Sequence, residues 1–134
     1  MLRLKAGDAE PCATSRSGDF LARPLSSLFW WGIPLLAGVL TNFLPIAPIT
    51  RTLVWIAAMA WMGVGCTLNA RRCHRLHCYI SAPVLFVGAM GAAAVALGFT
   101  PWGPSTASYV INVSLALALS TIVVESIWGK YRSP

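Results

Sequence analysis

The sequence predicts an all-α polytopic membrane protein with four transmembrane helices and both termini in the cytoplasm. Of its 134 residues, 57% are hydrophobic and only 10% are charged, whereas a soluble domain has about 25% charged residues to cover its surface. Four stretches are long and apolar enough to match a hydrocarbon core of about 30 Å. The basic residues gather in alternate loops, which is typical of a multi-pass membrane protein.

The four apolar stretches are separated by charged residues or by proline and glycine. Arg51 separates the first two, and two prolines and a glycine in residues 100–105 form the turn between the last two. Pro34 predicts a local distortion of the first span, and Pro83 is expected in the first turn of the third span, where a missing N–H costs little. None of the stretches alternates in polarity as a barrel strand does, so helices are expected. The predicted spans cover residues 25–46, 52–70, 79–99 and 108–128.

The transmembrane domain is therefore expected over residues 25–128, with a polar cytoplasmic tail over 1–24 and a short cytoplasmic tail over 129–134. Acidic residues precede the first apolar stretch, which is itself long enough to span, so no cleaved signal peptide is expected. Cys12, in the first tail, is expected to be a reduced thiol.

Orientation follows from the basic residues, nine of which lie in the two tails and the second loop. Arg51 is the tenth and lies in the first loop. Because lysine and arginine accumulate on the cytoplasmic side, both termini and the second loop are expected there, in a bacterial inner membrane. The net charge of +6 then sets orientation and does not indicate a nucleic-acid partner.

Three of the four cysteines and both histidines lie within residues 66–81. The cytoplasm keeps thiols reduced, which argues against disulfides here. On a continuous helix, residues three or four apart share a face. One such face would carry Cys66, Asn69, Cys73 and His77, and His74 with Cys78 would form a second pair. Cys66 lies roughly 10 Å from Cys73 on such a helix, so it could join a shared site only if the chain bends back.

Thiolate and imidazole are the donors that Zn(II), Cu(I) and Hg(II) prefer, whereas Mg and Ca prefer oxygen. The three arginines among these residues would favour thiolates but would also repel a free cation. The expected ligands are Cys73, His77 and Cys78, with His74 or Cys66 as a fourth, and the interleaved arginines are Arg71, Arg72 and Arg75. Two alternatives remain open: thiol redox chemistry, or arginines that only orient the chain while the cysteines pack as small hydrophobic residues.

Glu125 is the one acidic residue in a predicted span. It is expected to pair with Arg71 or Arg72, or to take part in proton coupling or metal ligation. The third span has unusually small side chains, so it is expected either at the centre of the bundle or as a docking face for another copy or a larger complex. Its small residues are Gly88, Gly91, Ala92, Ala93, Ala94 and Gly98.

The run Asn69-Ala-Arg-Arg-Cys-His-Arg-Leu-His-Cys78-Tyr79, followed by Pro83 and an apolar span, resembles a signature of small bacterial inner-membrane proteins. In general organisation the chain is also similar to the small mercuric-ion transporters of the MerC and MerT type, which have few spans, no ATPase motif and cysteines near the membrane. That resemblance implies mercuric ion as the cargo. The chain departs from those transporters because its first span lacks their cysteine pair.

The leading hypothesis is an inner-membrane protein that binds or transports a soft metal ion through this cytoplasmic loop, with Cys66 as a relay thiol and Glu125 as a charge partner. One alternative is a non-catalytic subunit or assembly factor of a larger membrane complex, and another is a membrane thiol oxidoreductase. No catalytic residue is assigned, because the sequence contains no phosphate-binding loop and no Ser/His/Asp set.

Overall fold

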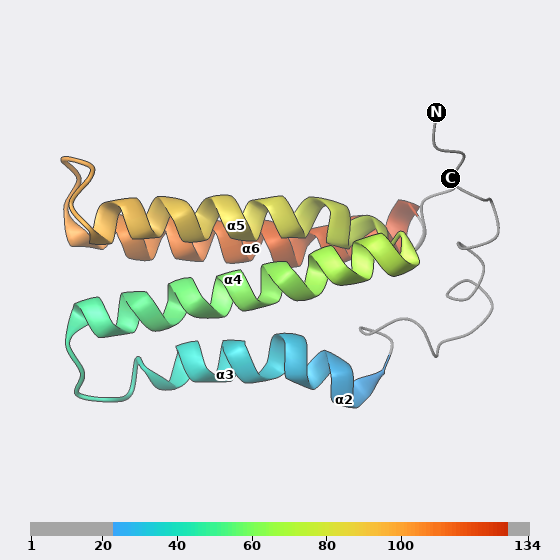
Figure 1. Cartoon of the computed structure of the whole chain (residues 1–134), viewed down its shortest axis with the longest axis horizontal. Helices are drawn as coiled ribbons and strands as arrows, with labels where there is room; N and C mark the ends of the chain where they lie inside the picture. Colours follow the sequence, from blue (N-terminus) through green and yellow to red (C-terminus); the bar gives the residue numbers. More distant parts are fainter. Residues whose placement is uncertain (1–22, 129–134) are drawn as a thin grey trace.

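The protein is all-α, as its sequence predicts, and its helices lie side by side with short connections between them (Figure 1). The computed structural model describes residues 23–128. The predicted tails cover residues 1–24 and 129–134, and of these only residues 23 and 24 are described. The prediction for Cys12 therefore lies outside the described residues. The elements are α2 (Pro24–Ser27), η1 (Leu28–Gly32), α3 (Ile33–Leu40), α4 (Pro48–Cys73), α5 (Leu76–Ala96) and α6 (Pro104–Trp128).

The helices are arranged in the order of the chain. The segment formed by α2, η1 and α3 packs on α4, α4 packs on α5, and α5 packs on α6 (Figure 1). The third predicted span, α5, therefore lies between α4 and α6. This is the central position expected from its small side chains.

Helices α4, α5 and α6 are each long and apolar enough to cross a membrane. They correspond to the predicted spans 52–70, 79–99 and 108–128, with different bounds. Helices α4 and α6 begin four residues earlier than predicted, at Pro48 and Pro104. Proline suits the first turn of a helix because its φ is already helical and its missing N–H would be unpaired there in any case.

The first predicted span, 25–46, is too long. Its helical segment is Pro24–Leu40, or about 25 Å at 1.5 Å per residue. The hydroxyl of Thr41 donates to the carbonyl of Gly38 at 2.6 Å, and the N–H groups of Asn42 and Phe43 bond to carbonyls three residues back. The helix therefore ends in a tight turn before Pro45, and the first segment is a shorter apolar helix than the other three.

The distortion expected at Pro34 takes the form of a wide helical turn. In η1 the backbone is π-helical, and the N–H of Ile33 donates to the carbonyl of Leu28 five residues back. Pro34 has no N–H with which to bond the carbonyl of Trp30, so the regular pattern is interrupted at this point.

Pro83 lies in the interior of α5, so its predicted place in the first turn is wrong. The reason is that α5 begins at Leu76, three residues before the predicted start, after Arg75 in an extended conformation. The carbonyl of Tyr79 therefore loses the N–H that a residue other than proline would supply.

The close approach of α5 to its neighbours depends on small side chains. A Cβ atom on Gly88 would clash with the side chain of Ser114 in α6 and would lie 2.6 Å from Cε of Met59 in α4. Further along the interface, the hydroxyls of Ser81 and Thr121 lie 2.7 Å apart, and Ser81 also donates to the carbonyl of Ala118 at 3.2 Å. Such polar contacts tie helices together where no water is present.

Large apolar side chains cover the outer surfaces of the helices. Leu36 of α3 is 59% exposed, Val87 of α5 is 69% exposed and Val123 of α6 is 60% exposed. Exposed apolar area of this kind is unfavourable in water but is the normal surface of a protein in lipid. The three long helices and this surface identify a membrane protein.

Gly88→Ala should destabilise the protein by about 1–3 kcal/mol, because the new methyl group overpacks the junction of three helices. Gly91→Ala is the matched control on the same helix. Its Cβ would lie 3.4 Å from Cγ1 of Val110, an ordinary contact, and the change should be neutral or stabilising by up to about 1 kcal/mol. Thermal unfolding in detergent, followed by circular dichroism, measures both. Equal melting temperatures for the two variants would contradict the packing described here.

Candidate thiol site at the turn between α4 and α5

The cysteine- and histidine-rich segment folds as a helical hairpin (Figure 1). Helix α4 ends at Cys73, and His74 takes a left-handed conformation with φ 50° and ψ 35° while its N–H donates to the carbonyl of Ala70. Arg75 is extended, and α5 begins at the next residue. Histidine is among the residues that adopt the left-handed region more often than most. The chain therefore reverses within two residues, and the continuous helix considered from the sequence does not form.

The reversal places Cys66 and Asn69 of α4 beside His77 and Cys78 of α5, and we call these four residues the dithiol site. All four side chains are buried, with 0% of Cys66, Asn69 and Cys78 exposed and 5% of His77. The thiols of Cys66 and Cys78 are in hydrogen-bonding contact, and both are free. The condition expected from the sequence, that Cys66 joins the site only if the chain bends back, is met.

Two nitrogen atoms lie within hydrogen-bonding distance of the sulfur of Cys78. The Nδ2 of Asn69 donates to this sulfur at 3.6 Å, and Nε2 of His77 lies 3.3 Å from it. Together with the thiol of Cys66, three polar side chains therefore meet at one buried sulfur, which is uncommon among apolar membrane helices.

Trp31, which belongs to η1, packs against the dithiol site and contacts Cys66. Its side chain is 9% exposed, and its indole interacts with the thiol of Cys66. Within the described residues, however, its buried Nε1 has no partner in good hydrogen-bonding geometry. A buried N–H without a full partner is costly, and it would be better satisfied by a sulfur that carries negative charge.

The remaining predicted site residues are placed differently. Cys73 is buried but disulfide-bonded, so the expectation of reduced thiols holds for Cys66 and Cys78 and not for Cys73. A disulfide sulfur has no thiolate charge with which to bind a cation, so the predicted role of Cys73 as a ligand requires its reduced form. His74 is half-buried, and its Nδ1 lies 2.7 Å from the hydroxyl of Tyr79, with the two rings stacked.

The predicted charged partners surround this end of the molecule. Arg71 and Arg72 are exposed, whereas Arg75 is half-buried and interacts electrostatically with Cys66. Glu125 belongs to α6, and its side chain lies outside the described part of the structure. Among the side chains that the structure describes, which exclude that of Glu125, no group of three or more His, Cys, Asp or Glu converges as a metal site would require. The dithiol site thus offers two thiols with one imidazole beside them.

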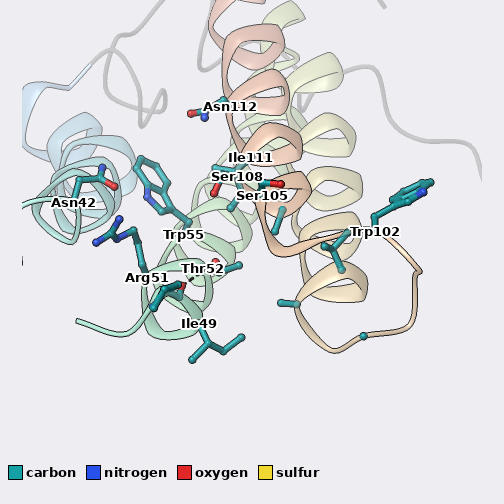
Figure 2. A pocket seen from close by; sticks show the side chains of 15 residues that line it. Asn42, Ile49, Arg51, Thr52, Trp55, Trp102, Ser105, Ser108, Ile111 and Asn112 are labelled. Atoms are coloured by element: carbon teal, nitrogen blue, oxygen red, sulfur yellow. Dashed lines mark hydrogen bonds between the residues drawn. The ribbon is translucent and has the colours of Figure 1, made fainter. Parts of the chain in front are cut away.

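A cavity of about 820 Å³ lies at the opposite end of α4, between α4 and the start of α6. Figure 2 shows Arg51 and Asn42 on one side of Trp55, with Ser108 and Asn112 of α6 on the other side. This cavity could not be predicted from a sequence motif, because its lining residues are scattered between positions 42 and 112 over three helices and two loops. The one available signal is that Arg51 is the single basic residue on its side of the predicted membrane.

Comparison with known proteins yields no relative: no family model, no curated protein and no solved structure matches the chain.

Mild oxidation should join Cys66 to Cys78, because their thiols are already in contact. In a Cys12→Ser/Cys73→Ser background, oxidised protein should lose two mass units by intact mass spectrometry, whereas the same background with Cys78→Ser should not. Before oxidation, a bulky maleimide should modify neither thiol until the protein is unfolded, because both are fully buried. Rapid modification of both thiols in folded protein would contradict the site described here.

Proposed function

We propose that this protein is a bacterial inner-membrane protein that binds a soft metal ion, Cu(I) or Hg(II), between the thiolates of Cys66 and Cys78. The observation that carries the proposal is the contact of two free, buried thiols from neighbouring helices. An ion bound to both would hold the sulfurs about twice a metal–sulfur bond of ~2.3 Å apart.

The composition of the dithiol site favours Cu(I) or Hg(II) over Zn(II). A structural zinc site has four protein ligands in a tetrahedron, whereas the described residues form no group of three or more. Soft ions bind thiolates strongly. His77, whose Nε2 lies 3.3 Å from the sulfur of Cys78, is placed to hydrogen-bond with a thiolate there.

Charge balance supports the same proposal. A Hg(II) ion with two thiolates is neutral, and a Cu(I) ion with two thiolates carries one negative charge. A buried charge needs a partner, and Arg75 interacts electrostatically with Cys66 from the turn. Both complexes are therefore compatible with burial at this depth, and the N–H groups of Asn69 and Trp31 would face sulfur atoms rich in negative charge.

Transport is the natural extension of this binding. Cys66 lies two helical turns before the end of α4, so an ion held there has already passed the arginine-rich turn. Exchange of thiolate ligands would move the ion into and out of the dithiol site, with Cys66 as the relay expected from the sequence.

A thiol oxidoreductase is the second candidate, and the same contact between Cys66 and Cys78 favours it. Forming a disulfide removes two electrons and two protons from the pair, so this function needs an oxidant that can reach a fully buried site. Metal binding needs no such partner, and we therefore place it first.

Purified wild-type protein in detergent should retain one Cu(I) or Hg(II) per chain after desalting, whereas Cys66→Ser/Cys78→Ser should retain none, because serine oxygen is a poor ligand for soft ions. Elemental analysis of the desalted protein measures this. Cys73→Ser is the matched control and should bind as wild type does. The assignment would be overturned if Cys73→Ser lost the metal while the double variant kept it. The ligands would then be the set predicted from the sequence around Cys73.

We propose further that the chain crosses the membrane four times with both termini in the cytoplasm. The α2–η1–α3 segment packs along α4 (Figure 1), which supports a place for it in the bilayer beside α4 even though it is shorter. Arg71, Arg72 and Arg75 lie at the end of the molecule where α2 begins, and Arg51 lies at the other end. This distribution supports a cytoplasmic position for the turn between α4 and α5.

Single cysteines introduced at Thr50 and Ser105 in a cysteine-free variant should react with a membrane-impermeant maleimide in intact cells. Both positions are exposed and lie at the Arg51 end. Arg71→Cys, which is exposed at the other end, should react only after the cells are opened. The reverse pattern, read by gel shift, would contradict the proposed orientation.

A further inference from the structure

The cavity at the Arg51 end has the size and composition of a ligand site. Its volume of about 820 Å³ falls within the range of pockets that hold small molecules. It is lined by apolar side chains, including Trp55 and Ile111, together with a few polar groups, including Asn42, Ser108 and Asn112. Arg51 is the one charged residue among its lining residues.

Arg51 has no anion to pair with in this part of the protein. Its Nε is buried and has no hydrogen-bond partner within the described residues. The single acidic residue between positions 23 and 128 is Glu125, which lies near the far end of α6, whereas the cavity lies against the beginning of that helix. Among the described residues Arg51 has no acidic partner, and a guanidinium without a counter-charge is unfavourable in a membrane protein, so a bound anion would stabilise it.

The surroundings of Arg51 add positive potential. Helices α4 and α6 both begin at this end, with Pro48 and Ser105 among the cavity-lining residues of their first turns and Ser108 in the second turn of α6. The N-terminal end of a helix carries a partial positive charge. Figure 2 shows the side chains of Arg51 and Trp55 adjacent in the same view, so a ligand that meets the guanidinium also meets an aromatic face.

We propose that this cavity binds an anionic amphiphile, whose phosphate or carboxylate group accepts hydrogen bonds from Arg51 and whose hydrocarbon part packs on Trp55, Val95 and Ile111. The apolar wall is the reason for choosing an amphiphile over a small anion, because inorganic phosphate would leave that wall without a partner. The occupant is therefore of the class of anionic membrane lipids, and the site is separate from the dithiol site at the other end of α4.

Native mass spectrometry of the full chain tests this proposal with defined probes. Wild-type protein should retain phosphatidylglycerol in preference to phosphatidylcholine, and Arg51→Gln should weaken phosphatidylglycerol binding by about tenfold, the scale expected for a lost charge-assisted hydrogen bond. Arg71→Gln, an exposed arginine at the other end of the same helix, is the matched control and should bind as wild type does. Arg51→Lys should restore part of the binding.

Two further variants separate the proposal from misfolding and from the metal site. Ser108→Leu should reduce binding by filling the cavity from the opposite wall, while Cys66→Ser/Cys78→Ser should leave lipid binding unchanged. Equal binding of phosphatidylglycerol by wild type and Arg51→Gln would overturn the proposal. So would inorganic phosphate binding as tightly as phosphatidylglycerol, because the cavity would then be a site for a free anion and not for an amphiphile.

Discussion

The two-residue reversal at His74 and Arg75 is the constraint on which the dithiol site depends. On a continuous helix, Cys66 and Cys78 would lie twelve residues apart, or about 18 Å. The turn instead folds α5 back along α4, so that two thiols from different helices meet. The same reversal brings Asn69 of α4 to the sulfur of Cys78, where His77, the preceding residue of α5, already lies. The geometry of four side chains thus follows from one left-handed residue and the extended residue after it.

The fold class and three long helices could be predicted because they depend on local composition. An apolar run between charged residues identifies a helix that crosses lipid, whatever it packs against. The ends of the helices were harder to predict, since they depend on single residues: Pro48 and Pro104 start helices earlier than hydropathy suggests, and Thr41 helps end one earlier. In the same way, the place of Pro83 depended on where α5 begins, and hydropathy carries no signal for that position.

The site could be predicted in composition but not in geometry. Residues 66–81 were recognisable because cysteine and histidine are concentrated there. Which of these side chains meet depends on the turn, and a periodic pattern on one helix cannot reveal a contact between two helices. Trp31 was missed for the same reason, since it reaches Cys66 from a segment 35 residues away in the sequence. The cavity around Arg51 was harder still to predict, because its lining residues come from three helices and form no sequence pattern.

Cysteine suits a metal site at this depth for a physical reason that carboxylates do not share. An empty pair of thiols is neutral and packs as two small hydrophobic residues, so Cys66 and Cys78 are buried without an unpaired charge. Two carboxylates in the same place would each require a partner or a proton before any ion arrived. With thiols, negative charge appears only as the cation replaces the protons, and the complex with a divalent ion is again neutral. At the other end of α4, Arg51 is in the opposite situation. Its charge is permanent, and its buried Nε has no hydrogen-bond partner among the described residues, which is why we propose an external anion as its ligand.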